Sequence, residues 1–351
     1  MIHLLLLAGA LAFATQAWAA PDIDRLDRAV LAAEAAGFKG QLLAGDRQAV
    51  LYDRTVGMET PDLWIWGSVS KQIAATLVMM EVERGMLSLD DTVTSRLPAF
   101  PDPDTGAATL RQLLQHTSGL PDPDAAGDGD VYRRAGPTAG GTADALGLCA
   151  GPRARPTGTF AYNNCDTIVL GAVLEAATGL SFGELFARKI AEPLGLTSAR
   201  MARPGETFPI SRSGGASGAG SAGPETPIYV AAYGPGGALV GPARDLMAID
   251  QALLTGALVS PESAQTLWRG EPSLGYVALG AWGFTAPLAG CAQPVRLVER
   301  RGAVDGVQTR NLLAPDLGRA LILFTPDADL EFGEIWQGEG LTHDLAAAAF
   351  C

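Results

Sequence analysis

Ser68 and Lys71 stand three positions apart at the start of an apolar stretch that continues to Met80. Residues at positions i and i+3 share one face of a helix, so the Ser68 hydroxyl and the Lys71 amine can meet. Burial and nearby positive charge lower the pKa of a lysine, and its neutral amine can then accept a proton from serine. The spacing therefore predicts a serine nucleophile with a lysine base, at a helix N-terminus whose free N–H groups favour an oxyanion.

Lysine at position 71 is informative because the chain otherwise prefers arginine. The chain has 25 Lys and Arg residues, and its lysines are Lys39, Lys71 and Lys189. Arginine stays protonated in proteins and cannot act as a base. The alternative is a solvated lysine beside a helix-capping serine, because a lone Ser-x-x-Lys spacing also arises by chance.

Composition limits the class of protein and of partner. The 351 residues are 48% hydrophobic and 18% charged, which suits one large globular domain or two lobes around a cleft. The formal net charge of −13 argues against nucleic acid or an anionic membrane surface as a partner. No pattern in the sequence indicates an oligomeric state.

The first 19 residues are typical of a secretory signal peptide. Residues 4–13 form an apolar core, and Ala17-Trp18-Ala19 fits a small-x-small cleavage site. An uncleaved membrane anchor is the alternative, but this apolar run is short for a bilayer. No later stretch is apolar over a longer run, so no stable membrane span is expected. The prediction is a periplasmic or secreted protein whose domain occupies residues 20–351.

Four cysteines follow the predicted signal peptide, and an oxidising compartment makes disulfides plausible. Three connectivities exist, of which Cys149–Cys165 with Cys291–Cys351 is preferred. The chain has no C-x-x-C or H-E-x-x-H spacing, so no metal is expected. A literal G-x-G-x-x-G at residues 218–223 follows no strand and precedes Pro224, so no dinucleotide or other cofactor is predicted.

Hydrophobic periodicity predicts the helices and strands that must position Ser68 and Lys71. Helices are predicted at residues 22–36, 69–84, 166–178, 182–190, 243–254 and 341–350, and residues 109–121 are predicted to form a short capped helix that ends in a turn. Strands are predicted at 41–44, 49–52, 282–285, 295–300, 306–313 and 320–325, as antiparallel hairpins. Residues 121–142 and the Gly/Ser/Ala-rich residues 211–223 are predicted loops. The order implies an α+β, sandwich-like domain with an inserted helical lobe at roughly residues 72–240.

Three further segments accompany the Ser-x-x-Lys spacing in a fixed order. They are Leu-Leu-Gln-His-Thr-Ser-Gly-Leu-Pro at 113–121, Tyr-Asn-Asn at 162–164, and Gly-Gly-Ala-Leu with Ala-Arg-Asp-Leu at 236–246. Together they resemble the penicillin-binding protein and β-lactamase superfamily, in the branch of class C β-lactamases, D-alanyl-D-alanine carboxypeptidases and related esterases. The resemblance implies a β-lactamase/transpeptidase-like fold, with an antiparallel sheet flanked by terminal helices and an inserted helical lobe.

The resemblance departs at the third family box, which is Lys or His, any residue, then Gly on a strand along the cleft. Here Arg300 and Arg301 precede Gly302. Arginine keeps a cation that can bind a substrate carboxylate, even bidentately, but it cannot donate its proton. The alternative interpretation is that Arg300 is a solvated strand residue in a repurposed site.

The resemblance also implies roles for individual residues. Ser68 attacks a carbonyl carbon, and Lys71 and Tyr162 share its proton, with Tyr162 serving the leaving group. For substrate binding, Asn164 orients Lys71 and the substrate amide, Arg300 and Gly302 border the substrate, and the N–H groups of Ser68 and Ala303 hold the oxyanion. His116 is interpreted as a structural histidine at a helix end whose hydrogen bonds are satisfied, and Trp64 and Trp66 as core residues.

These roles imply an exported serine hydrolase that forms an acyl-enzyme on an amide or ester. The resemblance thus implies a small-molecule or peptidoglycan-derived substrate, such as a β-lactam or a D-Ala-D-Ala peptide. An esterase of small acyl esters on the same fold is the alternative, and Arg300 favours it. A catalytically silent binding protein is a third hypothesis, against which the intact Ser68, Lys71 and Tyr162 argue. A shared fold does not fix the substrate.

Overall fold

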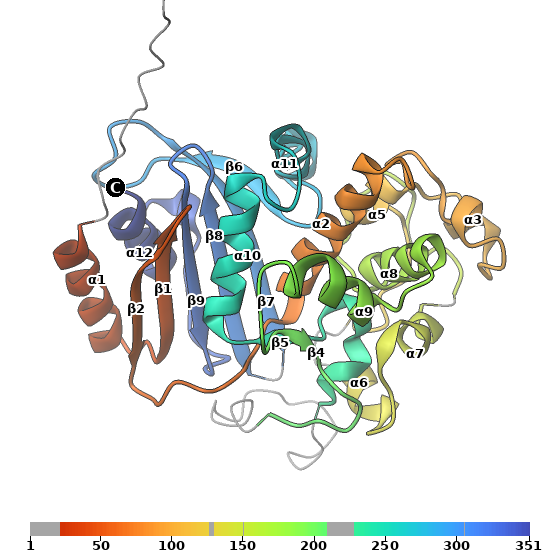
Figure 1. Ribbon diagram of the computed structural model, residues 1–351, viewed down its shortest axis with the longest axis horizontal. Helices are drawn as coiled ribbons and strands as arrows, with labels where there is room; N and C mark the ends of the chain where they lie inside the picture. The colour runs from red at the N-terminus through yellow and green to blue at the C-terminus, as the bar shows by residue number, and fades with distance from the viewer. Residues whose placement is uncertain (1–21, 126–129, 150, 209–227, 305) are drawn as a thin grey trace, which may run out of the picture.

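The computed structural model describes residues 22–125, 130–149, 151–208, 228–304 and 306–351. The predicted signal peptide and the Gly/Ser/Ala-rich loop at 211–223 lie outside these residues. Figure 1 shows a sheet with helices on both faces, joined to a lobe built mainly of helices. This arrangement places the N-terminal end of α2 (Ser70–Glu83) at the junction of the two parts.

The main sheet has six antiparallel strands in the order β2-β1-β9-β8-β7-β6. Their bounds are β1 Gly40–Asp46, β2 Val50–Val56, β6 Trp282–Ala286, β7 Val295–Val304, β8 Val307–Ala314 and β9 Arg319–Thr325. The predicted strands and hairpins are therefore confirmed, with ends that differ by a few residues. The pairing of β7 with β6 ends at Glu299, whereas its pairing with β8 continues to Val304, so the later residues of β7 have no strand on the β6 side.

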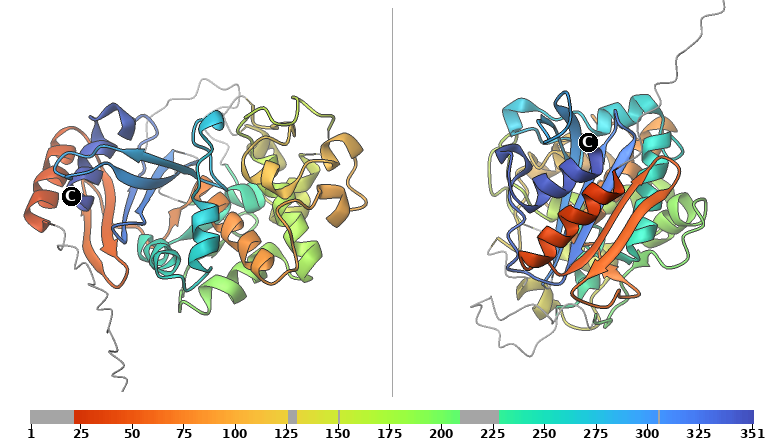
Figure 2. Two further views of the ribbon diagram at one scale, coloured as in Figure 1. Left: turned by 90° about the horizontal axis from the view of Figure 1, so that it is seen from above. Right: turned by 90° about the vertical axis from the view of Figure 1, so that its left-hand side faces the viewer.

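Alternate side chains of the sheet enter two different cores, as the two-residue period of a strand requires. Leu321 and Leu323 of β9 pack with the terminal helices α1 (Ile23–Ala35) and α12 (Leu341–Phe350). Ile322 and Phe324 face the other way, into the core shared with α2 and α10 (Ala243–Thr255). Figure 2 shows α1 and α12 side by side over one face of the sheet. The terminal helices thus flank the sheet as predicted.

The helical lobe is built around α8 (Cys165–Thr178), whose first ten residues are all buried. The other lobe helices are α3 Val93–Arg96, α4 Pro103–Gly106, α5 Leu110–Leu114, α6 Asp130–Ala135, α7 Gly141–Gly147 and α9 Phe182–Phe186, which continues as a π-helix over Ala187–Ala191. A small sheet in the order β3-β5-β4 (Trp64–Ile65, Leu239–Gly241, Arg200–Met201) joins the lobe to the segment before Ser68. Another helix, α11 (Pro261–Leu267), lies near α2.

The prediction of a loop over residues 121–142 is wrong in part, because α6 and the start of α7 lie within it. Tyr132 of α6 is fully buried, and its ring stacks on that of Tyr233 with 3.5 Å between centroids. This tertiary contact outweighs the Pro, Gly and Asp content that indicated a loop.

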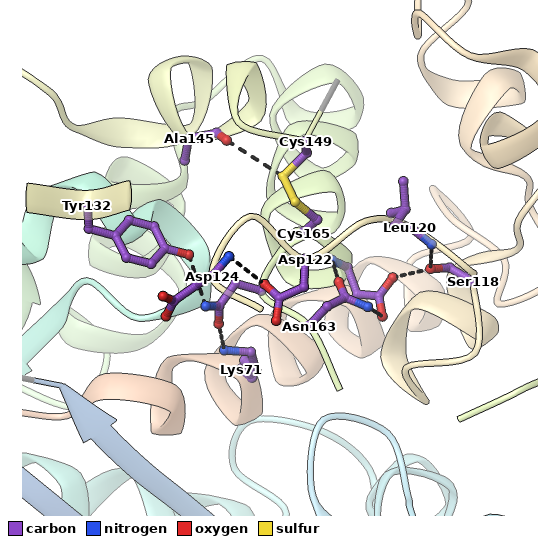
Figure 3. The surroundings of a disulfide bond; sticks show 12 residues. Lys71, Ser118, Leu120, Asp122, Asp124, Tyr132, Ala145, Cys149, Asn163 and Cys165 are labelled. Atoms are coloured by element: carbon purple, nitrogen blue, oxygen red, sulfur yellow. Dashed lines mark hydrogen bonds between the residues drawn. A yellow bond between two sulfur atoms is a disulfide. The ribbon is translucent and has the colours of Figure 1, made fainter. Parts of the chain in front are cut away.

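Both preferred disulfides are confirmed. Cys149 is bonded to Cys165 at the start of α8, as Figure 3 shows, and Cys291 is bonded to Cys351 at the end of α12. The first bond ties the segment after α7 to the helix that follows Asn164. Among the described residues no single helix has the length and apolarity to cross a membrane, and only the bent pair Cys165–Thr178 and Phe182–Ala191 meets that test jointly.

Candidate active site

Ser68 lies in a short 3₁₀-helix, Gly67–Val69, directly before α2. Gly67 has a φ of +54°, a left-handed conformation that suits glycine and turns the chain into the helix. Lys71 on the first turn of α2 is 1% exposed. Its Nζ donates hydrogen bonds to Ser68 Oγ at 3.0 Å, Asn164 Oδ1 at 2.7 Å and the Gly236 carbonyl at 2.6 Å. The structure therefore brings together the serine and lysine that the spacing paired.

Burial is the main cause that lowers the pKa of Lys71. The phenol of Tyr162 opposes this effect, and the positive charge of Arg300 adds to it. A lysine whose pKa is lowered in this way spends more of its time as the neutral amine near neutral pH. A solvated lysine is therefore the wrong interpretation of position 71.

Tyr162 lies in the turn that precedes α8, with its hydroxyl 2.7 Å from Ser68 Oγ. The guanidinium Nη2 of Arg300 donates a hydrogen bond to the same hydroxyl at 2.8 Å. The ring is 38% exposed, but its hydroxyl lies between these partners, and Lys71 Nζ is 5.1 Å from the ring centre. Burial raises the pKa of Tyr162, yet the charges of Arg300 and Lys71 outweigh it and lower this pKa to about 8.

Asn164 is 7% exposed, and its Oδ1 accepts a hydrogen bond from Lys71 Nζ. Its Nδ2 donates a hydrogen bond to the Tyr132 hydroxyl at 2.9 Å, and these two contacts fix the orientation of the amide. Sequence reasoning missed Tyr132, which lay in a predicted loop, and also the Gly236 carbonyl. The first glycine of Gly-Gly-Ala-Leu, Gly236, was a signal that the backbone could approach another group closely. No local pattern pointed to Tyr132.

Arg300 on β7 is 1% exposed, so the alternative of a solvated strand residue is wrong. Its Nε donates a hydrogen bond to the Ser68 carbonyl oxygen at 2.8 Å, and its Nη2 donates to Tyr162. A guanidinium holds a carboxylate bidentately along one edge, and here the Nε–Nη2 edge is already engaged by the protein. The neighbouring Arg301 lies on the other face of β7 and pairs with Glu299 at 2.8 Å.

Gly302 and Ala303 bring the backbone of β7 close to the segment around Ser68. A Cβ on Gly302 would collide with the Trp66 carbonyl oxygen and would lie 3.4 Å from the Ser68 nitrogen. A Cβ on Gly67 would lie 3.2 Å from the Ala303 nitrogen. The backbone of β7 at Gly302 and Ala303 is therefore in close contact with the segment that carries Ser68.

His116 differs from its interpretation as a histidine with satisfied hydrogen bonds. Its Nδ1 lies 3.0 Å from Asp166 Oδ2, but its buried Nε2 has no hydrogen-bond partner among the described residues. The ring centre lies 4.6 Å from that of Tyr162, and the His116 carbonyl accepts a hydrogen bond from the Ala161 N–H at 2.8 Å. Burial, with the charges of Arg300 and Lys71, lowers the pKa of His116 well below its ordinary value. A neutral His116 therefore buttresses the turn that carries Tyr162.

A buried polar cluster lies one layer behind the candidate site. Asp250 of α10 is fully buried, and its Oδ1 accepts hydrogen bonds from Gln72 at 3.3 Å and Asn311 at 3.1 Å. Gln72 follows Lys71 on α2, and Asn311 lies opposite Arg300 in the β7–β8 register. Burial raises the pKa of Asp250 from 3.8 to about 7.

We expect the protein to lose stability as the pH rises through this range. Between pH 3.8 and about 7 the folded protein keeps the Asp250 proton that the unfolded chain releases, so the free energy of unfolding falls with rising pH, by roughly 4 kcal/mol in total. The variant Asp250→Asn stays uncharged and should lack this component. Urea unfolding of both proteins across this range tests the prediction, which fails if their pH dependences coincide.

Comparison with known proteins finds one protein family and several relatives that match this sequence. The sequence matches the beta-lactamase family over residues 36–330. Over 159 residues it is 35% identical to Esterase EstB of Burkholderia gladioli, covering 42% of this chain and 41% of the esterase. It is 34% identical over 146 residues to Penicillin-binding protein 4 of Amycolatopsis lactamdurans, covering 40% and 36%. The matched stretches thus span less than half the length of these relatives.

Solved structures resemble the fold over nearly the whole chain. A D-stereospecific amidohydrolase from Streptomyces sp. has a TM-score of 0.69 at 23% identity and covers 94% of this chain and 99% of its own. A D-amino acid amidase from Ochrobactrum anthropi SV3 has a TM-score of 0.70 at 19% identity and covers 93% and 98%. The predicted fold class, α+β with an antiparallel sheet and a helical lobe, is confirmed.

Proposed function

The chain belongs to the beta-lactamase family, and we propose that it is a serine hydrolase that cleaves a small ester or a neutral amide through an acyl-enzyme on Ser68. One observation carries this proposal. Lys71 Nζ and Tyr162 Oη lie 3.0 and 2.7 Å from Ser68 Oγ, so two groups with lowered pKa values converge on one hydroxyl. Convergence of a nucleophile with proton acceptors is the arrangement that acyl transfer needs.

The proposed reaction begins with attack of Ser68 Oγ on the substrate carbonyl carbon. The hydroxyl proton passes to Lys71 or to Tyr162, and the Ser68 and Ala303 N–H groups hold the resulting oxyanion. Tyr162 then returns a proton to the departing alcohol or amine, which leaves Ser68 acylated. Water attacks the acyl-enzyme, the carboxylic acid departs, and Ser68 regains its proton. Asn164 keeps Lys71 directed at Ser68 throughout.

The contacts of Arg300 favour ester and neutral amide groups as substrates over molecules whose carboxylate must be bound by this arginine beside β7. The Nε–Nη2 edge of its guanidinium is occupied by the Ser68 carbonyl and the Tyr162 hydroxyl, and Ala303 adds no side-chain hydroxyl. The names of Esterase EstB and the D-stereospecific amidohydrolase accord with this choice. Hydrolysis of a β-lactam or a D-Ala-D-Ala peptide is the second candidate, supported by the similarity to penicillin-binding proteins.

We also propose that the enzyme works in the periplasm or outside the cell. Residues 1–19 have the pattern of a secretory signal, and two disulfides suit an oxidising compartment. Fractionation of a producing cell, with the mass of the mature N-terminus, tests this part separately from the chemistry.

Turnover of p-nitrophenyl butyrate and the intact mass after brief exposure to penicillin G test the chemistry. We expect ester hydrolysis by the wild type, its loss in Ser68→Ala, and no loss in Ser88→Ala, which changes an exposed serine. A lasting penicillin adduct on Ser68, or loss of the drug, would move the second candidate to first place. Unchanged ester hydrolysis in Ser68→Ala would refute the proposed nucleophile.

A further inference from the structure

A cavity of about 860 Å³ lies beside the candidate active site, at the outer edge of β6. Five aromatic residues line it: Trp268, Tyr276, Trp282, Phe284 and Trp336. Its volume is that of a site for a small organic molecule, and such sites are lined mainly by aromatic and apolar side chains with a few polar groups. The mechanism proposed above does not use this cavity.

Two of these rings remain in water although burial would stabilise them. Tyr276 is 50% exposed and Trp336 is 56% exposed. Tyr276 has a φ of +66°, a left-handed conformation that costs free energy for any residue with a Cβ, and such strain clusters at functional sites. Trp336 is held in place by Phe284, whose ring meets it edge-on, and by the Arg301 guanidinium 5.5 Å from its ring centre. The aromatic walls are therefore positioned before any ligand arrives.

The charge of the cavity is opposite to that of the protein. Arg269 and Arg296 line it and no carboxylate does, although the chain carries a formal net charge of −13. Arg296 pairs with Asp316 at 2.5 Å. Arg269 is exposed and makes no hydrogen bond or ion pair with another residue that the structure describes. Its guanidinium is free to bind an anionic group, with which it can form two parallel hydrogen bonds.

Trp282 connects the cavity with the candidate catalytic residues. Its ring centre lies 5.3 Å from Arg300 Cζ and 6.5 Å from the ring centre of Tyr162. Trp282 therefore belongs both to the wall of the cavity and to the surroundings of Tyr162 and Arg300. One guanidinium edge of Arg300 is engaged inside the site, whereas the guanidinium of Arg269 in the cavity is available to a carboxylate.

We propose that this cavity binds the end of the substrate remote from the reacting carbonyl, and that this end is an apolar or aromatic group that carries a carboxylate. The inference rests on the proposed function for its link to catalysis, but binding itself is measurable without turnover. Aromatic rings supply most of the affinity, and Arg269 discriminates between a carboxylate and a neutral group.

Calorimetric titration of Ser68→Ala with 4-phenylbutyrate tests binding, with 4-phenylbutyramide as the uncharged partner ligand. In this background Arg269→Gln should weaken 4-phenylbutyrate binding about tenfold and leave the amide unchanged, as expected for one lost charged contact. Trp336→Leu should weaken both ligands. Arg28→Gln removes an exposed arginine of α1, far along the chain, and should change neither. Both cavity side chains are exposed, and equal melting temperatures will verify that the variants fold.

A competition experiment distinguishes an error in the proposed role of the cavity from an error in the proposed catalytic mechanism. In the wild type, 4-phenylbutyrate should inhibit p-nitrophenyl butyrate hydrolysis competitively, and Arg269→Gln should relieve this inhibition, whereas Arg28→Gln should leave it in place. Equal affinity for the acid and the amide, no effect of Arg269→Gln, or binding without competition would each overturn the inference while ester hydrolysis still stood. Binding that follows the cavity variants in a protein that hydrolyses no ester would overturn the proposed function and with it the substrate role of the cavity.

Discussion

Replacing Lys71 with arginine is expected to lower kcat/KM for ester hydrolysis by a factor of roughly 10²–10⁴, although the positive charge is kept. The reason is chemical: a guanidinium cannot give up its proton to become a base near neutral pH. Lys71 Nζ makes three hydrogen bonds in a buried position, to Ser68, Asn164 and the Gly236 carbonyl. Its contribution is therefore a neutral amine that can take up the Ser68 proton, directly or after Tyr162, and charge alone does not replace it.

Two further variants separate this cause from simple disruption of the site. Lys71→Met has a similar length and no charge, and should lose about as much activity as Lys71→Arg. Lys189→Arg makes the same exchange at a lysine that is 28% exposed and pairs with Glu81, and should retain full activity. Initial rates with p-nitrophenyl butyrate, with melting temperatures beside them, supply the comparison. Wild-type rates in Lys71→Arg would exclude Lys71 as the base.

Local patterns predicted the elements that have strong local causes. The apolar positions after Ser68 predicted a helix in a core, and α2 is buried from Ser70 through Met79. The regular spacing of turn residues after residue 280 predicted the β6–β9 hairpins. The missed helix α11 had a readable signal, because Ser260 is its N-cap and Pro261 follows at its first turn.

Contacts between distant segments could not be predicted from any local pattern. Tyr132 reaches Asn164 because α6 packs beneath Tyr233, and nothing around residue 132 indicates that partner. The side chain of Arg300 is a second contact that no local pattern could predict. Its residue type indicated a cation beside the site, but the direction of its guanidinium depends on the Ser68 carbonyl, 232 residues away in the chain.

The cluster of Asp250, Gln72 and Asn311 was likewise invisible in the sequence. The helical pattern alone would place the charged Asp250 of α10 on the solvent-facing side of an amphipathic helix. In the structure Asp250 is buried and contacts Gln72 of α2 and Asn311 of β8. Gln72 directly follows Lys71 on α2, and Asn311 lies opposite Arg300 in the sheet. Chemistry-bearing residues were thus identifiable one at a time, while their mutual geometry came only from the packing of elements far apart in the chain.

The pH dependence of ester hydrolysis should depend on Arg300 through Tyr162. If the Tyr162 phenolate accepts the Ser68 proton, kcat/KM rises with pH and levels off above about 8, the lowered pKa of this phenol. Arg300 is the first charge that lowers this pKa, and its Nη2 donates a hydrogen bond to the phenol oxygen at 2.8 Å. Arg300→Met removes both effects, so the rising limb should move toward the ordinary value of 10.0.

The loss of rate caused by this higher pKa of Tyr162 is largest near neutral pH. There only a small fraction of Tyr162 is phenolate, and this fraction falls about tenfold for each unit by which the pKa rises. For a complete return of the pKa from about 8 to 10.0, the phenolate fraction at neutral pH falls by about a hundredfold, and the rate with it. Tyr162→Phe should lose the limb itself, and Arg111→Met, which changes an exposed arginine of α5, should keep it at about 8. A limb that stays in place in Arg300→Met would show that another group controls this step, and Lys71 would then be the acceptor that the pH profile reports.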